Sequence, residues 1–235
     1  MDNAELRHRF ATLTTAHLAD GCVRAGLEVR CAPSGIQASA PGARLAGRAL
    51  PAQHVGSVDI FLEAFGLAET GDILVVDNLG RLDESCVGDL VTLEAAGAGL
   101  GGIVIWGLNR DTVDMREIGL PVFSLGTIPT GPLHIGERAA NALVSATVGQ
   151  WTVTRDDLVV GDEDGVLFVP DAHAAEVFAH AETIRDTERR QAERIREGVS
   201  LRDQVQFARY LAARAADPSV TLRDHLRSVG GAIEV

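Results

Sequence analysis

The chain has 235 residues, of which 46% are hydrophobic, and a formal charge of −12, values that fit a globular protein and disfavour binding to a nucleic-acid backbone. The first residues, MDNAELRHRF, are too charged for a signal peptide, and no run approaches the ~18 apolar residues that a membrane span needs. All 21 basic residues are arginine, so Schiff-base enzymes, pyridoxal-phosphate enzymes and Walker A nucleotide binders, which need a lysine, are excluded.

The first part of the chain predicts helices and strands in alternation. Apolar residues at helical spacing predict a helix over residues 4–26, and a strand is expected over 44–53. Ser57 is expected to cap a short helix after that strand. The apolar segment DILVVDN, residues 72–78, predicts a buried strand.

The same alternation continues through the middle of the chain. Residues 84–100 predict a helix that ends in glycines, and the apolar run GIVIWG, residues 102–107, predicts a second buried strand. A short helix that ends at Gly119 and a third strand over residues 120–126 are expected next.

The last third of the chain has a different pattern. Residues 150–170 alternate as antiparallel strands do, and Gly165 is expected to supply a positive φ in the turn DEDG. A long charged helix, 171–197, is predicted to end at Gly198. Two further helical stretches are predicted, over residues 201–215 and 221–229.

These elements predict an α/β fold with a mixed-sheet core over residues 1–170 and a helical C-terminal arm over residues 171–235. The arm has few apolar positions, chiefly Ile184 and Ile195. It is therefore either a solvated helix or an arm that packs on a neighbouring subunit. Three cysteines without CxxC spacing indicate free thiols in a reducing cytoplasm.

Several motifs that could suggest other chemistry have simpler explanations. The glycine string GAGLGG, residues 97–102, follows a predicted helix, which reverses the order of a dinucleotide-binding motif. His173 and His180 are too far apart along a helix to chelate one ion. His134 is a weak candidate for substrate contact, and Cys86 is interpreted as a packing residue.

The segment GLNRD, residues 107–111, carries the strongest functional signal. Arg110 and Asp111 follow the most apolar predicted strand, and ligands of α/β sheets bind beyond the carboxyl ends of strands. A carboxylate suits a hard divalent cation, and a guanidinium binds a carboxylate or an enolate oxygen. The alternative is that Asp111 caps the next helix by accepting the amides of Val113 and Asp114, while Arg110 is solvated.

The segment from GDILVVD through GLNRD to GLPVFSLG resembles the central signature of the RraA-like proteins. This superfamily contains class II 4-hydroxy-4-methyl-2-oxoglutarate and 4-carboxy-4-hydroxy-2-oxoadipate aldolases and the regulator of ribonuclease E activity. The resemblance covers roughly residues 10–200, including DDLVVGDEDGVLFVP. It departs from the usual pattern in GLN, which stands where GAV is usual, and in a tail that extends past the matched part.

The resemblance implies a swivelling β/β/α fold assembled as homotrimers or homohexamers with active sites between subunits. It implies that Asp111 serves Mg²⁺ or Mn²⁺ and that Arg110 stabilises a pyruvate enolate. The backbone amides of Gly88, Asp89, Leu90 and Val91 would bind the substrate carboxylate, with Asp89 in place of the usual glutamate. A glutamate from a neighbour's C-terminal helix would complete the metal site. Glu188 is the first choice for it, with Glu182 and Glu193 as rivals.

The sequence therefore predicts a cytoplasmic, metal-dependent carbon–carbon lyase that acts on a small 2-oxo acid without nucleic-acid or membrane partners. It would cleave a 4-hydroxy-2-oxo acid as an aldolase or decarboxylate oxaloacetate, because both reactions pass through a pyruvate enolate. The alternatives are a non-catalytic regulator that binds a ribonuclease, or a different metal-enolate reaction on the same scaffold. The absence of lysine supports a metal-assisted route to the enolate.

Overall fold

The computed structural model describes residues 1–229, so residues 230–235, at the end of the predicted arm, lie outside the described residues. The chain divides into two compact units. The first comprises Met1–Ala16 and Val29–Ala175, and the second comprises His17–Glu28 and the chain from Glu176 onward. No helix within residues 1–229 is long and apolar enough to cross a membrane.

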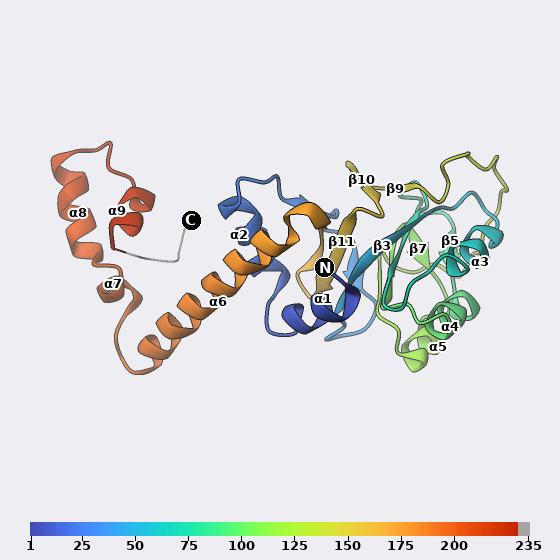
Figure 1. Ribbon diagram of the computed structural model, residues 1–235, viewed down its shortest axis with the longest axis horizontal. Coiled ribbons are helices and arrows are strands. Elements are labelled where there is room, and N and C mark those ends of the chain that lie inside the picture. The colour runs from blue at the N-terminus through green and yellow to red at the C-terminus, as the bar shows by residue number, and fades with distance from the viewer. Residues whose placement is uncertain (230–235) are drawn as a thin grey trace. The chain divides into compact units, whose positions relative to one another are not determined.

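A mixed sheet forms the basis of the first unit (Figure 1). It has eight strands in the order β1-β12-β11-β3-β4-β6-β8-β2. Two smaller sheets pair β9 with β10 and β5 with β7. The strands are β1 (Arg30–Cys31), β2 (Gln37–Ala38), β3 (Leu45–Gln53), β4 (Ile73–Asp77), β5 (Ser85–Val87), β6 (Gly102–Trp106), β7 (Leu108–Asn109), β8 (Val122–Ser124), β9 (Ser145–Val148), β10 (Trp151–Thr154), β11 (Asp157–Asp162) and β12 (Gly165–Pro170).

The helices are divided between the two units. The first unit holds α1 (Asn3–Phe10), α3 (Asp59–Phe65), α4 (Asp89–Gly97), α5 (Thr112–Ile118) and the 3-10 turn η1 (Asp171–His173). The second unit holds most of α2 (Thr15–Arg24) and α6 (Ala174–Arg196), and all of α7 (Leu201–Gln204), α8 (Phe207–Ala216) and α9 (Leu222–Val229).

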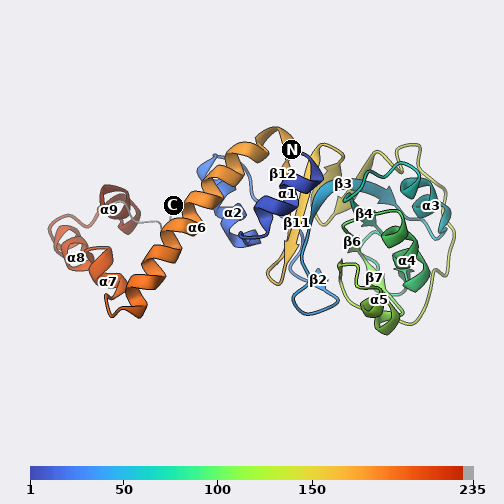
Figure 2. The same cartoon turned by 60° about the horizontal axis from the view of Figure 1, so that its bottom comes forward.

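The central strands are buried on both faces, which explains why their sequences are continuous apolar runs. In β4, Leu74 and Val76 pack in one core cluster with residues of α3 and α4, while Ile73 and Val75 pack in the other cluster. This alternation is the period of two that a strand imposes on its side chains. Figures 1 and 2 show α3, α4 and α5 on the same side of the sheet.

Most predicted elements are confirmed. The strands predicted at 72–78 and 102–107 are β4 and β6, and residues 150–170 form the antiparallel strands β10, β11 and β12. Gly119 ends α5 with a φ of +77°, and Gly198 follows α6 with a φ of +94°. The turn glycine Gly165 has the expected positive φ, +123°.

The helix predicted over residues 4–26 is wrong in its continuity, because it is broken into α1 and α2. The second helix begins where the Asp162 carboxylate accepts hydrogen bonds from the Thr15 amide at 2.8 Å and from its hydroxyl at 2.7 Å. A buried carboxylate from a distant strand thus stabilises a helix start inside an amphipathic stretch. Sequence periodicity alone does not reveal such a contact.

Three other predicted helices differ in their bounds. The helix predicted over 84–100 is a strand, β5, followed by α4. The helix predicted to be capped by Ser57 begins at Asp59, and Val58 occupies its N-cap position. The stretch 201–215 is interrupted between α7 and α8, where Gln206 has a φ of +50°.

Candidate active site

The candidate site lies at the carboxyl ends of β3, β4 and β6, which are parallel neighbours. Their register pairs Gln53 with Asp77 and Asp77 with Trp106. The residues that follow these three strands therefore leave the sheet along one edge. In α/β sheets this edge is where ligands bind.

Pairing between β5 and β7 positions Arg110. The Arg110 amide donates to the Val87 carbonyl at 3.0 Å, which brings the arginine beside Gly88. A Cβ on Gly88 would collide with Asp111 Oδ2 and lie 3.3 Å from Arg110 Nε. On the other side, a Cβ on Gly131 would lie 2.7 Å from an Arg110 guanidinium nitrogen. Two glycines thus provide the space for the Arg110 side chain.

Asp111 does not cap α5 with its side chain, so this alternative is wrong in the structure. Its backbone occupies the N-cap position in the left-handed region, with a φ of +56°. The carboxylate instead pairs with Arg110, with Oδ2 3.2 Å from Nε, and the two side chains are 35% and 46% exposed. A left-handed conformation is uncommon for a residue with a side chain and costs roughly 1 kcal/mol. This conformation leaves the Asp111 carboxylate partly exposed to solvent beside the Arg110 guanidinium.

The N-terminus of α4 opens into the same pocket. Gly88 is its N-cap residue and supplies no side-chain acceptor. The first amides of a helix, here those of Asp89, Leu90 and Val91, have no intrahelical acceptor and favour an anion. The pocket has a volume of about 490 Å³ and is lined by all four residues of the predicted carboxylate-binding loop and by Arg110. This arrangement can bind a carboxylate between helix amides and a guanidinium.

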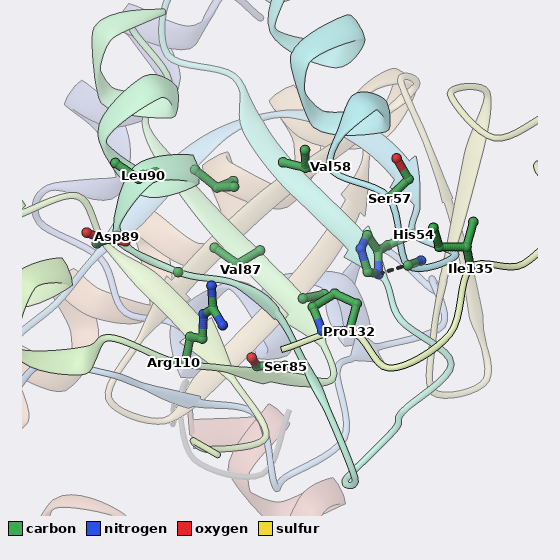
Figure 3. Close-up of a pocket in the computed structure, with 14 residues that line it drawn as sticks. His54, Ser57, Val58, Ser85, Val87, Asp89, Leu90, Arg110, Pro132 and Ile135 are labelled. Carbon is green, nitrogen blue, oxygen red and sulfur yellow. Dashed lines mark hydrogen bonds between the residues drawn. The ribbon is translucent and has the colours of Figure 1, made fainter. Parts of the chain in front are cut away.

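The opposite side of the pocket is formed by residues that the sequence did not identify as site candidates. Figure 3 shows Arg110 and Asp89 on one side, and His54, Ser57 and Ile135 on the other. His54 is buried, immediately follows β3, and stacks on Phe61 with the ring centroids 5.2 Å apart. The signal that could have revealed it is the one used for Arg110, a polar side chain directly after an apolar strand.

Burial lowers the pKa of His54 below its ordinary value of 6.5, because the charged imidazolium loses its hydration. The hydrogen bond with Asn78 and the carboxylates of Glu84 and Asp59 oppose this shift without reversing it, and the Arg81 cation adds to it. His54 is therefore neutral at pH 7.

A loop without regular secondary structure closes this side of the pocket and is tied down by backbone contacts. The Leu133 amide donates to the buried Glu84 carboxylate at 2.7 Å, and the Gly136 amide donates to the Val55 carbonyl at 2.7 Å. Pro132 and Ile135 of this loop line the pocket. The predicted substrate contact His134 is exposed in the same loop but is not among the lining residues.

The remaining sequence candidates lie as follows. Glu188 belongs to the second unit, on α6, where its carboxylate oxygen is 3.1 Å from His17 Nε2. Cys86 lines the pocket but is buried, and burial raises the pKa of its thiol well above the ordinary value, which fits a packing role. Within residues 1–229 no three His, Cys, Asp or Glu side chains gather closely enough to enclose a metal ion. Any metal held by the first unit alone would therefore depend on few protein ligands, and Asp111 is a partly exposed carboxylate beside Arg110.

Comparisons with known proteins place the chain in a family. Residues 15–168 match a sequence model described as Aldolase/RraA. A putative 4-hydroxy-4-methyl-2-oxoglutarate aldolase of Halalkalibacterium halodurans is 31% identical over 120 residues, 51% of this chain and 56% of the relative. A protein of the same name from Dechloromonas aromatica is 36% identical over 105 residues, 45% of this chain and 63% of the relative. The matches thus span less than two thirds of these curated relatives.

The fold is also that of solved members of the family. The structure of a Streptomyces coelicolor protein, described as an unusual member of the RNase ES inhibitor RraA protein family, aligns with a TM-score of 0.69 at 28% identity. The alignment covers 79% of this chain and 94% of that chain. The swivelling β/β/α architecture expected from the sequence is thereby confirmed. With two thirds of its length matched by the family model, the chain belongs to the RraA-like, Aldolase/RraA family.

Proposed function

We propose that this protein is a divalent-metal-dependent carbon–carbon lyase that acts on a 2-oxo acid through a pyruvate enolate. The observation that carries the proposal is the convergence of three groups at one edge of the sheet. These are the free amides at the start of α4, the Arg110 guanidinium, and an Asp111 carboxylate that makes no cap hydrogen bond. The putative aldolase names of two relatives support the same reaction class.

In the proposed reaction, the substrate carboxylate binds the amides of Asp89, Leu90 and Val91, which point into the pocket from a helix N-terminus. The 2-oxo oxygen then lies on the side of Arg110. When the bond between C3 and C4 breaks, its electron pair moves into the 2-oxo group, and the guanidinium stabilises the resulting enolate oxygen. Aldol cleavage and oxaloacetate decarboxylation both generate this negative charge at the same oxygen.

The residues present fit a largely hydrated divalent cation. Mg²⁺ commonly takes one or two protein carboxylates and keeps several water ligands. The Asp111 carboxylate is 35% exposed and makes no hydrogen bond to its own helix, so it can serve as one such ligand. When bound, Mg²⁺ or Mn²⁺ would supply Lewis-acid polarisation of the substrate's 2-oxo group.

A second carboxylate would come from a neighbouring copy of the chain in a homotrimer or homohexamer, and Glu188 is our choice. Its side chain is 46% exposed, and its contact with His17 is a surface pair of small energetic value. Glu188 can therefore leave His17 to bind a metal ion at little cost in stability. Exposed apolar side chains near the pocket support burial against another copy. They include Leu90, which is 75% exposed, and Ile135, which is 82% exposed.

A ribonuclease-binding regulator is the second candidate, because the Streptomyces coelicolor relative is described as an RNase ES inhibitor. The two functions make different demands on the site. A lyase needs a metal-binding carboxylate near the guanidinium that lines the pocket, and Asp111, paired with Arg110, meets this need. Co-purification with ribonuclease E, run beside the pyruvate assay described next, distinguishes them.

The direct test measures pyruvate release from 4-hydroxy-4-methyl-2-oxoglutarate and from oxaloacetate in the presence of Mg²⁺. We expect activity with Mg²⁺ and its loss with EDTA. Arg110→Ala should lower turnover roughly 10²- to 10³-fold, the usual effect of removing an oxyanion donor. It should lower stability by less than about 1 kcal/mol, because the Arg110–Asp111 pair is half exposed.

Arg138 offers a matched control, because it is another half-exposed arginine with a single carboxylate partner, Glu63 at 2.7 Å. Arg138→Ala should leave turnover unchanged. Activity that persists after exhaustive chelation contradicts the metal dependence. If Arg110→Ala unfolds the protein instead, Arg110 is a structural residue.

A further inference from the structure

His54 is held at the pocket by contacts that fix its ring. Its imidazole stacks on Phe61 with the planes 4° apart, and its Nδ1 lies 2.8 Å from Asn78 Oδ1. Gly107 leaves room for Asn78, because a Cβ on Gly107 would lie only 2.9 Å from the Asn78 side chain. His54, Asn78 and Gly107 each directly follow one of three parallel strands, so the backbone of the sheet sets their positions.

Two contacts at Nδ1 bear on which ring nitrogen carries the proton. Asn78 Oδ1, 2.8 Å away, accepts only from a protonated Nδ1, whereas the Gly56 amide, 3.4 Å away, donates only to an unprotonated Nδ1. The contact with Asn78 is the shorter and therefore the stronger, which favours the tautomer with a proton on Nδ1 over the weak bond from Gly56. The lone pair of the neutral ring is then on Nε2. Within residues 1–229 Nε2 makes no hydrogen bond, and in Figure 3 it turns toward the side of the pocket that carries Arg110.

The orientation of the Asn78 side chain carries an energetic penalty. The amide nitrogen of Asn78 is buried and has no hydrogen-bond partner in the described chain. An unpaired buried donor costs roughly 1–3 kcal/mol. In this orientation Asn78 presents its amide oxygen to Nδ1 of His54 and leaves its amide nitrogen unpaired.

We propose that His54 is the general base for aldol cleavage, accepting through Nε2 the proton of the substrate's 4-hydroxyl group. This inference rests on the proposed function, which places the pyruvate half of the substrate at Arg110 and the helix amides. The distal half of the substrate, with its hydroxyl, then faces the opposite side of the pocket, where His54 lies.

The step balances as follows. The 4-hydroxyl proton passes to Nε2, C4 becomes a carbonyl, and the bond between C3 and C4 breaks with its electron pair moving into the 2-oxo group. The imidazolium then returns the proton to C3 of the enolate, so pyruvate forms and His54 is neutral again. Oxaloacetate decarboxylation releases CO₂ instead and has no hydroxyl proton to remove. Its enolate takes a proton from water, so this reaction does not require His54.

The electrostatic surroundings of His54 suit a base that works at neutral pH. The charged groups that influence it are the carboxylates of Glu84 and Asp59 and the Arg81 guanidinium, and burial dominates among these influences. The net effect keeps the pKa of His54 below 6.5, so the unprotonated form prevails at pH 7. The rate of aldol cleavage should therefore fall as the pH drops below 6.5, which gives the pH profile an acid limb.

The experiment compares two reactions in the same His54→Gln protein with Mg²⁺ present. Cleavage of 4-hydroxy-4-methyl-2-oxoglutarate should fall about 10²-fold or more, the usual contribution of a general base. Oxaloacetate decarboxylation should change less than about threefold, which also shows that the variant is folded. His173→Asn, at an exposed histidine outside the pocket, is the control and should affect neither reaction.

A second variant tests the same base without removing it. Asn78→Asp places a carboxylate against Nδ1, which raises the pKa of His54 and should move the acid limb of aldol cleavage to higher pH. The inference for His54 alone would be overturned by either of two results in His54→Gln, an equal loss of both reactions or no loss of aldol cleavage. It would also be overturned if the acid limb of aldol cleavage did not move in Asn78→Asp. A wild-type protein that performs neither reaction would overturn the proposed function as well. If the wild type cleaves the aldol substrate but does not decarboxylate oxaloacetate, the test of His54 is the pH profile. The acid limb of aldol cleavage must then be present and must move to higher pH in Asn78→Asp.

Discussion

Substitution of Gly88 by alanine should separate the geometry of the site from the stability of the fold. The backbone of Gly88 has a φ of −133°, which alanine tolerates. A Cβ at this position would nevertheless come closer to Asp111 Oδ2 than the 3.0 Å that real Cβ atoms respect, and would press on Arg110 Nε at 3.3 Å. Both side chains are partly exposed and can move into solvent, so the clash is relieved by displacing the Arg110–Asp111 pair.

The size of the effect follows from this displacement. Relieving the overlap requires a shift on the order of 1 Å, and such a misplacement of catalytic groups can reduce turnover about 10²-fold. The loss of a partly exposed ion pair costs less than about 1 kcal/mol. We therefore expect Gly88→Ala to lose most of its activity while its free energy of unfolding barely changes.

The assay follows pyruvate release with Mg²⁺, together with urea unfolding. Gly97→Ala is a matched control in the same helix, because a Cβ there meets nothing within 4 Å. It should keep full activity and gain up to about 1 kcal/mol of stability, since alanine favours a helix more than glycine does. Full activity in Gly88→Ala would refute the assignment of the pair to the active site.

Two further predictions concern ionisable groups outside the reaction. Burial raises the pKa of Asp171, but hydrogen bonds from Arg48 at 2.9 Å and from the N-terminal ammonium at 3.1 Å outweigh this effect and hold the pKa below its usual value of 3.8. Because the pKa of Asp171 is lower in the folded state, its ionised carboxylate stabilises the protein above pH 3.8. This stabilisation is lost as the pH falls through the folded-state pKa. Asp171→Asn should therefore lower the free energy of unfolding by about 1 kcal/mol at pH 7. The difference in Tm from wild type should shrink below pH 3.8. A difference in Tm that stays constant with pH would contradict this contribution of the Asp171 carboxylate. Iodoacetamide at pH 8 should label the exposed Cys31 before the buried Cys86, although burial raises the pKa of both thiols. Peptide mapping that finds Cys86 labelled in the native protein as fast as Cys31 would contradict its burial.

The sequence alone predicted the elements whose formation depends on local pattern. The apolar runs of β4 and β6 and the glycines that end α5 and α6 were recognised because their signals lie within a few residues. The prediction failed where a distant group decides the local structure. The Asp162 carboxylate starts α2 inside an amphipathic stretch, and pairing with β7 makes β5 a strand within a predicted helix.

The residues of the candidate site also fall into those that the sequence predicts and those that only the tertiary structure reveals. Sequence reasoning predicted Arg110 and Asp111 from their place after a strand, and the loop that begins at Gly88 from a family resemblance. Only the tertiary structure decided that Asp111 leaves α5 uncapped, that Gly88 makes room for the pair, and that His54 faces the same pocket. The physical reason is that strand register brings together residues far apart in the chain. No local pattern records which side chains meet at the end of a sheet.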